Sequence, residues 1–289
     1  MIPSAFEYLR PTSLAEATRL LARHADEAKI LAGGHSLLPM MKLRLANPGI
    51  IIDIGRLSEL HGIHEENGMI IIGACTTHYA AESSPILQQR CPLMAETAAA
   101  IGDVQVRNCG TVGGSVAHAD PAADWPAAVL ALEAQITLAS NNGNRTIGAA
   151  DFFVDMLTTT MESNEILTEI RVPANPPSTG SAYLKVAQPA SGFALTGVAA
   201  QVTLGADNTV QQVVVGITGV DSRPFRASAT ENALRGQAAT EAAISQAAAL
   251  ATEGAEALED IHASPEYRLH LARVYTKRAL LKAVERAQA

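Results

Sequence analysis

A cluster of prolines limits what this sequence can fold into. Pro173, Pro176 and Pro177 are followed closely by Gly180. Proline fixes φ and removes a backbone donor, so neither a helix interior nor a central strand can run through the segment 173–180. Strand and helix signals alternate before this segment, whereas long β-rich stretches and then helices follow it. The pattern predicts an α+β chain of at least two domains, with a linker at 173–180.

Local signals predict the elements on both sides of the linker. Ser13 followed by Glu16 forms a capping box at the start of a helix, and the turn at 65–68 marks a hairpin. A helix is expected over 85–100. Strands are further predicted near 50–54, 69–73, 135–140, 165–172, 193–204 and 210–218, and helices near 125–132, 239–251 and 265–287.

The composition narrows the classes of partner. The formal net charge is −8 and aromatic residues make up 4% of the chain, which disfavours nucleic acid and anionic membranes as partners. No apolar run reaches the roughly 18 residues that a membrane span needs, and no secretory signal is visible. Three cysteines without a C-x-x-C pair support neither a disulfide framework nor a cysteine-bound cluster. We therefore expect a cytoplasmic protein.

Two short glycine segments carry the clearest chemical signal. Residues 32–36 (AGGHS) and 111–115 (TVGGS) each contain a glycine pair and end in a hydroxyl. Paired glycines reach backbone angles closed to other residues, and their missing side chains let a phosphate oxygen approach converging N–H groups. The hydroxyls of Ser36, Thr111 or Ser115 would add donors. The segments therefore predict a diphosphate cradle that needs no lysine, although neither matches the Rossmann or the P-loop pattern.

Alternative interpretations stay open at this point. A glycine pair is also the ordinary sign of a tight turn that binds nothing. Asp124 offers a similar choice between two roles. Its carboxylate either accepts hydrogen bonds from sugar or ribityl hydroxyls, or caps the helix that begins at Trp125.

Other candidate features favour structural roles. His61 and His64 have an i, i+3 spacing but lie beside a predicted turn, so we predict no metal site. Cys109 is expected to be a small packed residue. No general acid or base stands out, so no catalytic side chain is predicted. An acidic group is interpreted as a solvated helix face or, alternatively, as a subunit contact: Glu253, Glu256, Glu259 and Asp260.

The two glycine segments belong to longer motifs. Residues 31–45 (LAGGHSLLPMMKLRL) and 106–124 (VRNCGTVGGSVAHADPAAD) together resemble the FAD-binding medium subunits of molybdenum hydroxylases. This family includes the carbon monoxide dehydrogenase medium chain, the xanthine dehydrogenase family and enzymes acting on N-heteroaromatic compounds. The resemblance implies an N-terminal FAD-binding domain at 1–175, with two PCMH-like α/β subdomains at about 1–56 and 57–175. A C-terminal domain at 180–289, a β-sheet with helices, would follow.

The resemblance also implies which residues bind FAD. The two glycine segments would contact the diphosphate, Asp124 would lie near the ribityl or adenosine hydroxyls, and Leu167 would line the isoalloxazine side. Lys185 and Phe193 would come from the C-terminal domain, which closes over the flavin. The implied FAD-binding residues are Leu31, Ala32, Gly33, Gly34, His35, Ser36, Leu37, Ile101, Thr111, Gly114, Ser115, Ala117, Asp124, Leu167, Lys185 and Phe193.

One stretch departs from the family's pattern. Relatives often carry an arginine and an aspartate where Gln188 and Gly192 stand here, and a hydroxylated aromatic ring where Phe193 stands. The resemblance therefore does not extend to a charge network near the flavin, which bears on the redox potential. The three scattered cysteines also exclude the iron–sulfur loop that some relatives insert.

The function implied by the resemblance is electron transfer. A large partner subunit would hold the molybdenum cofactor and hydroxylate the substrate, and a small partner subunit would carry [2Fe–2S] clusters. The FAD of this chain would pass the electrons to an external acceptor. The resemblance implies a dimer of such heterotrimers. Two alternatives stay open: a stand-alone FAD-dependent reductase or oxidase of a related fold, and a non-catalytic binding module in which the glycine segments are only turns.

Overall fold

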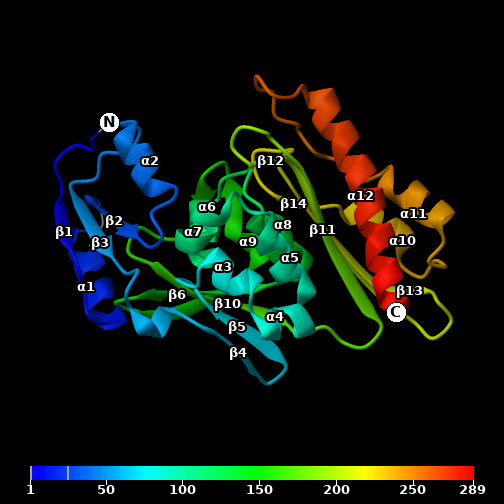
Figure 1. Ribbon diagram of the computed structural model, residues 1–289, viewed down its shortest axis with the longest axis horizontal. Coiled ribbons are helices and arrows are strands. Elements are labelled where there is room, and N and C mark those ends of the chain that lie inside the picture. The colour runs from blue at the N-terminus through cyan, green and yellow to red at the C-terminus, as the bar shows by residue number, and fades with distance from the viewer. Residues whose placement is uncertain (1, 25) are drawn as a thin grey trace.

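The computed structural model describes residues 2–24 and 26–289, and its N-terminal part is built on a small parallel sheet (Figure 1). The elements of this part are β1 (Glu7–Leu9), α1 (Leu14–His24), β2 (Ala28–Leu31), α2 (Leu37–Lys42), β3 (Ile50–Asp53) and the 3-10 helix η1 (Ser58–Leu60). The strand order is β1-β3-β2. Ile50 and Ile52 of the central strand share one core with Ala17 and Leu21 of α1, which confirms the predicted buried strand.

The first helix begins almost as the sequence predicts. The N–H of Glu16 donates to the hydroxyl of Ser13 at 3.2 Å. The Glu16 carboxylate, however, accepts from the N–H of Thr12 at 2.7 Å rather than from Ser13. The second hydrogen bond of the capping box is therefore made with Thr12 instead of Ser13. The N–H groups of Thr12 and Glu16 both have acceptors.

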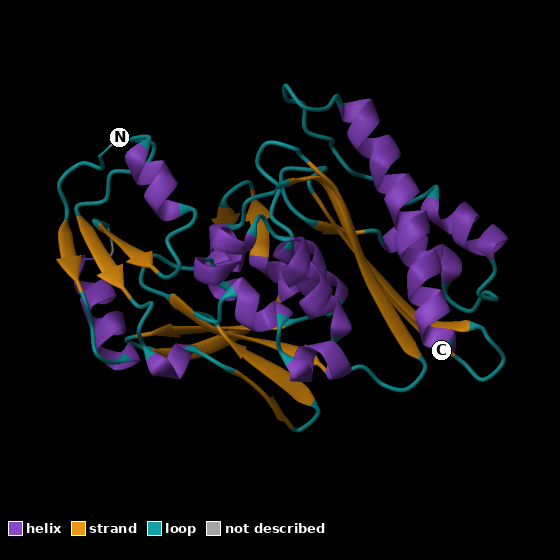
Figure 2. Cartoon of the chain, viewed as in Figure 1, coloured by secondary structure: helices purple, strands orange, loops and turns teal. Residues whose placement is uncertain are grey.

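A five-stranded antiparallel sheet forms the middle of the molecule (Figure 2). Its strands, in spatial order, are β4 (Ile63–Glu66), β5 (Met69–Gly73), β10 (Ile166–Pro173), β6 (Gln135–Ser140) and β7 (Gly143–Gly148). The predicted hairpin is confirmed between β4 and β5, where Asn67 and Gly68 both have positive φ. Ile72 and Ile136 of the sheet share a core with Trp125 and Leu93 of the helices that cover it.

The helices of this middle part lie together over the sheet (Figure 1). They are α3 (His78–Glu82), α4 (Pro85–Arg90), α5 (Pro92–Ala100), α6 (Val104–Cys109), α7 (Val112–His118), α8 (Trp125–Ala131) and α9 (Ala149–Phe152). A small hairpin of β8 (Phe153–Asp155) and β9 (Thr158–Thr159) follows α9. The prediction of one helix over 85–100 is wrong. Cys91 leaves the helical region, with φ −152° and ψ 67°, because Pro92 lacks an N–H and disfavours helical backbone in the residue before it.

The C-terminal part is a second antiparallel sheet covered by helices (Figure 2). Its elements are β11 (Thr179–Ala187), β12 (Ala194–Leu204), β13 (Val210–Thr218), β14 (Phe225–Arg226), α10 (Ser228–Leu234), α11 (Glu241–Ala248) and α12 (Pro265–Gln288). Val198 and Ala200 of β12 pack with α12, whereas Ala199, which points to the other face, belongs to the middle core. The sheet is therefore enclosed between α12 on one side and the middle helices on the other.

A glycine allows one very close approach between these parts. A Cβ on Gly216 of β13 would lie on the carbonyl oxygen of Ala127 in α8. The backbone of the C-terminal sheet thus touches the backbone of α8 directly.

The acidic residues near the C-terminus do not form a helix face, so that prediction is wrong. Glu253, Glu256, Glu259 and Asp260 lie in turns and irregular chain between α11 and α12. Gly254 has a φ of +78°, and Asp260 accepts from two nearby backbone N–H groups and pairs with the buried Arg268. Among the helices of residues 2–24 and 26–289, none has both the length and the apolar character needed to cross a membrane.

Candidate cofactor site

A cavity of about 620 Å³ lies where four segments of the chain meet. These are residues 31–37 after β2, residues 110–118 at the start of α7, the first residues of β10, and residues 191–193 between β11 and β12. The volume falls within the range of roughly 300–1,000 Å³ that is usual for ligand pockets. All of the implied FAD-binding residues except Lys185 line this cavity.

The first glycine segment has the backbone that the sequence predicts. Gly34 has a φ of +74°, which an L side chain rarely adopts. Gly33 packs so closely on residues 109–110 that a Cβ there would lie on the carbonyl oxygen of Cys109. Within the part of the chain that the structure describes, the N–H groups of Gly34, His35 and Ser36 have no acceptor. This run of unpaired donors opens onto the cavity.

The second glycine segment differs from the prediction of a loop with converging N–H groups. Residues 112–115 are the first turn of α7, and Gly113 and Gly114 have no positive φ. Their donors are already used, because Gly113 N–H donates to Ala74 O at 2.9 Å and Gly114 N–H donates to Thr111 Oγ1 at 3.2 Å. Gly113 is needed for packing instead, since a Cβ there would lie 2.5 Å from the Cβ of Ala74.

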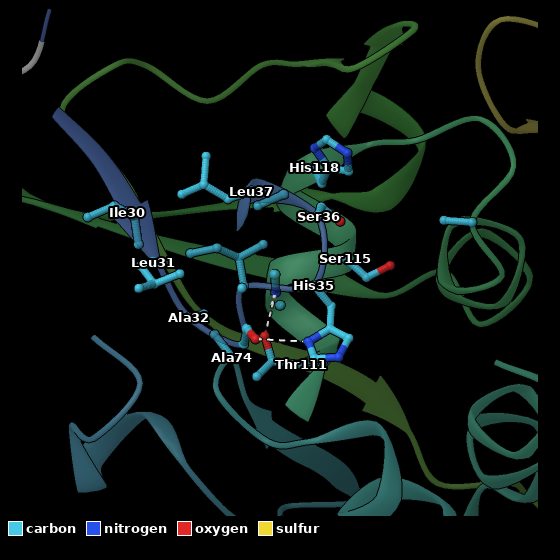
Figure 3. Close-up of a pocket in the computed structure, with 18 of the residues that line it drawn as sticks. Ile30, Leu31, Ala32, His35, Ser36, Leu37, Ala74, Thr111, Ser115 and His118 are labelled. Atoms are coloured by element: carbon cyan, nitrogen blue, oxygen red, sulfur yellow. Dashed lines mark hydrogen bonds between the residues drawn. The ribbon is translucent and has the colours of Figure 1, made fainter. Parts of the chain in front are cut away.

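The two segments lie against each other, as the sequence predicts. A Cβ built on Gly114 would be 3.8 Å from the Cβ of Ala32. Figure 3 shows the first segment running beside α7, with the His35 ring next to Thr111. His35 is fixed there by a contact of 3.1 Å between its Nδ1 and the carbonyl oxygen of Gly33. The two glycine segments, far apart in the sequence, therefore line one cavity together.

Asp124 occupies the N-cap position of α8, but its carboxylate does not cap the helix. Its backbone is helical and its side chain makes no cap hydrogen bond. The carboxylate instead accepts from the hydroxyl of Tyr183 at 2.5 Å and pairs with Lys185 Nζ at 2.9 Å. Burial raises the pKa of Asp124, while Lys185 and Tyr183 act in the opposite direction. The C-terminal sheet thus supplies the partners of a carboxylate that lines the cavity.

Lys185 has a different place from the one the resemblance implies. Its side chain does not line the cavity, because its ammonium group is buried behind Asp124. Besides the carboxylate, Nζ donates to the carbonyl oxygens of Ala100 and Gly192, each at 2.7 Å. Lys185 therefore ties together α5, α8 and the 188–193 loop, and holds the wall of the cavity from outside.

The 188–192 stretch uses its unusual residues for internal bonds. Gln188 accepts from the N–H of Ser191 at 2.8 Å. Gly192 has a φ of +73° and offers its carbonyl oxygen to Lys185. Phe193 follows, with 45% of its surface exposed, on the wall of the cavity. The loop is thus shaped by a glycine and an amide at the positions where relatives often carry charges.

Cys109 and His78 are two further residues near the cavity. Cys109 is exposed rather than packed, so that prediction is wrong. His78 lines the cavity although nothing in the sequence singled it out. The only signal for His78 was its position after a predicted strand, and the residue that binds its ring, Trp125, is 47 positions away.

The donors and walls of the cavity fit an FAD. Unpaired backbone N–H groups on a glycine segment suit a diphosphate, and the hydroxyls of Thr111 and Ser115 stand beside them on the cavity wall. A Cβ on Gly34 would lie 2.8 Å from Leu38 Cδ1, and one on Gly114 would lie 2.6 Å from Thr111 Oγ1, so neither position has room for a side chain. The apolar walls that a planar ring system needs come from Leu31, Leu37, Ile101, Ala117, Leu167 and Phe193.

Comparisons with known proteins agree with this site. The family model described as FAD binding domain in molybdopterin dehydrogenase matches residues 4–175. The model described as CO dehydrogenase flavoprotein C-terminal domain matches residues 181–283. The chain is 44% identical over 280 residues to the carbon monoxide dehydrogenase medium chain of Hydrogenophaga pseudoflava, with 97% of each covered.

Solved structures give the same result. A carbon monoxide dehydrogenase structure from Hydrogenophaga pseudoflava matches with a TM-score of 0.96 and 45% identity, covering 99% of both chains. Quinoline 2-oxidoreductase from Pseudomonas putida 86 matches with a TM-score of 0.93 and 34% identity, covering 100% of both.

The chain therefore belongs to the family of FAD-binding medium subunits of molybdenum hydroxylases. It is an oxidoreductase subunit, its cofactor is FAD and its role is electron transfer. The predicted α+β architecture, an FAD-binding domain followed by a sheet with helices, is confirmed. Family membership leaves no support for a stand-alone reductase or a non-catalytic module.

Proposed function

We propose that the first glycine segment holds the FAD diphosphate through the N–H groups of Gly34, His35 and Ser36. The observation that carries this proposal is the run of unpaired donors on the cavity wall. The second segment contributes differently, through the hydroxyls of Thr111 and Ser115. The flavin ring then lies along the apolar walls near Leu167.

When bound, the flavin accepts electrons singly or in pairs, which lets it connect one-electron carriers with a two-electron acceptor. The residues of this chain bind and orient it. The Asp124–Tyr183–Lys185 cluster fixes the polar wall of the cavity, and Lys185 also holds the 191–193 segment, which lines the cavity beside it. No described side chain needs to act as a general acid or base for this role.

We further propose the larger assembly. A large subunit would hold the molybdenum cofactor, and a small subunit would carry the [2Fe–2S] clusters that reduce this chain's FAD. Two such heterotrimers would associate in the cytoplasm. This is supported by relatives that are medium chains or subunits of complexes, among them the 6-hydroxypseudooxynicotine dehydrogenase complex of Paenarthrobacter nicotinovorans and a Cu,Mo-CO dehydrogenase.

We also propose domain boundaries at 1–175 and 180–289, with subdomains meeting near residue 56. The first family model ends at residue 175, inside the proline cluster, and the second begins at residue 181, just after it. β10 ends at Pro173 and β11 begins at Thr179, so Pro176 and Pro177 lie in the connection between two sheets. The parallel sheet has a core cluster of its own, to which Cys75 and Ile166 of the second subdomain also contribute, and this supports a division near residue 56.

The binding proposal is tested with two matched glycine variants of the purified chain. Gly34→Ala adds a Cβ at a φ of +74° inside the cavity wall, and Gly236→Ala adds one at a φ of +77° in open space. Both carry a similar backbone penalty of roughly 1–2 kcal/mol. We expect the first variant to lose its bound FAD, measured as absorbance near the flavin band relative to protein, and the second to keep it. Equal flavin content in both would contradict the proposal.

A further inference from the structure

His78 is held between the core and the cavity. It is the first residue of α3, only 4% of its surface is exposed, and its N–H donates to Gly110 O at 2.9 Å. On one side of the ring, Trp125 Nε1 donates to His78 Nδ1 at 3.0 Å. On the other side, the ring edge lies so close to Gly110 that a Cβ there would be 2.7 Å from His78 Nε2.

The contact with Trp125 decides the tautomer of this histidine. An indole nitrogen can only donate, so Nδ1 of His78 must be the acceptor and carries no proton. Burial lowers the pKa of His78 to about 4, so the ring is neutral near pH 7. A neutral imidazole without a proton on Nδ1 carries it on Nε2. His78 is therefore a fixed donor at Nε2.

That donor has no partner in the described part of the chain. No hydrogen bond from His78 Nε2 to residues 2–24 or 26–289 is found. The atom is also not among the buried side-chain atoms that are sealed off without a partner. Nε2 therefore keeps some accessible surface, and His78 lines the cavity together with Gly110, His35 and Thr111.

We propose that His78 is a further FAD-binding residue, locked by Trp125 so that its Nε2–H donates to an oxygen of the diphosphate. This inference rests on the proposed function, because it needs FAD in this cavity. Its neighbours His35 and Thr111 belong to the segments that would hold the diphosphate. A donor that is neutral and already oriented loses little entropy when the oxygen arrives.

Two substitutions test the roles of the two ring nitrogens separately. His78→Asn keeps an acceptor oxygen near Nδ1 for Trp125 but ends before the position of Nε2. His78→Gln places an amide donor near Nε2 but leaves Trp125 without its acceptor. We expect His78→Asn to unfold like the wild type and to bind FAD at least about tenfold more weakly, as for the loss of a hydrogen bond to a charged group. We expect His78→Gln to unfold earlier and to retain most of its FAD affinity.

A third variant acts on the ring without changing it. Gly110 has a φ of −60° and a ψ of 144°, so the backbone allows alanine there. Its Cβ would lie 2.7 Å from His78 Nε2 and 3.1 Å from the carbonyl oxygen of Val106, so Gly110→Ala acts mainly by displacing the His78 ring. We expect it to weaken FAD binding about as much as His78→Asn does, and to have no further effect when combined with His78→Asn.

The measurements are FAD titration of the flavin-free chain, followed by flavin fluorescence, and thermal unfolding of the same samples without FAD. Crossed effects, with affinity lost in His78→Asn and stability lost in His78→Gln, support the inference. Unchanged FAD affinity in His78→Asn would overturn it, and so would additive effects of His78→Asn and Gly110→Ala. If the wild-type chain itself binds no FAD, the proposed function fails rather than this step.

Discussion

Replacing Lys185 with Met should strongly destabilise the chain, because it removes a buried charge from a point where three parts of the fold are joined. The ammonium group donates to Ala100 O, Gly192 O and the Asp124 carboxylate. The side chains of Lys185 and Asp124 are only 7% and 4% exposed. Met has a similar length and stays apolar, so the main change is the loss of the charge and its hydrogen bonds.

The magnitude follows from the burial of the pair. Removing one partner of a buried ion pair leaves the other charge without compensation, which costs about 3–5 kcal/mol. Tyr183→Phe is the matched control, since it removes one hydrogen bond to the same carboxylate and leaves the ion pair intact, for a loss of about 1.5–3 kcal/mol. The double variant Lys185→Met, Asp124→Asn removes both charges, and its stability should return to within about 2 kcal/mol of the wild type.

Urea unfolding of the FAD-free chain measures these differences. Trp125 is the only tryptophan and directly follows Asp124, so its fluorescence reports unfolding at the site itself. The loss of unfolding free energy in Lys185→Met should also be smaller at acidic pH. Without Lys185, the buried Asp124 carboxylate has a raised pKa and becomes neutral as the pH falls through that pKa. A loss below about 1 kcal/mol in Lys185→Met, or a double variant less stable than Lys185→Met, would refute the reasoning.

Three further predictions concern the cavity and its surroundings. Gly33→Ala should give no folded protein by circular dichroism, because its Cβ would lie on the carbonyl oxygen of Cys109. Gly114→Ala should fold and lose FAD, because its Cβ would displace the Thr111 hydroxyl. Full FAD content in purified Gly114→Ala would contradict this. Burial lowers the pKa of His78 to about 4, so protonation favours the unfolded chain and stability is lost as the pH falls from about 6.5 towards 4. The wild type should therefore lose about 2 kcal/mol more than His78→Asn between pH 7 and pH 5 in urea unfolding, and equal losses would disprove it. One thiol of three should react with a thiol reagent in the native chain, because only Cys109 is exposed among the cysteines; reaction of all three without denaturant would argue against the fold.

The sequence predicts the strands and the main helices because these follow from local patterns. The isoleucine run of β3 and the Asn-Gly turn between β4 and β5 are read from neighbouring residues alone. The break at Cys91–Pro92 is equally local, and the helix predicted across it is wrong because proline restricts the backbone of the residue before it. The first glycine segment also behaves as its residues indicate, with Gly34 at positive φ.

The roles of the site residues, in contrast, depend on contacts that no local pattern contains. Asp124 has the sequence surroundings of a helix cap, yet its partners are 59 and 61 positions away on another sheet. The sequence suggests that Gly113 and Gly114 free the backbone, yet they let a helix pack on Ala74 and use up the donors that a loop would have offered. His78 has no motif at all until Trp125 fixes its tautomer. Local sequence determined which backbone angles and hydroxyls are available here, and packing between distant segments decided which of those donors stay free to bind.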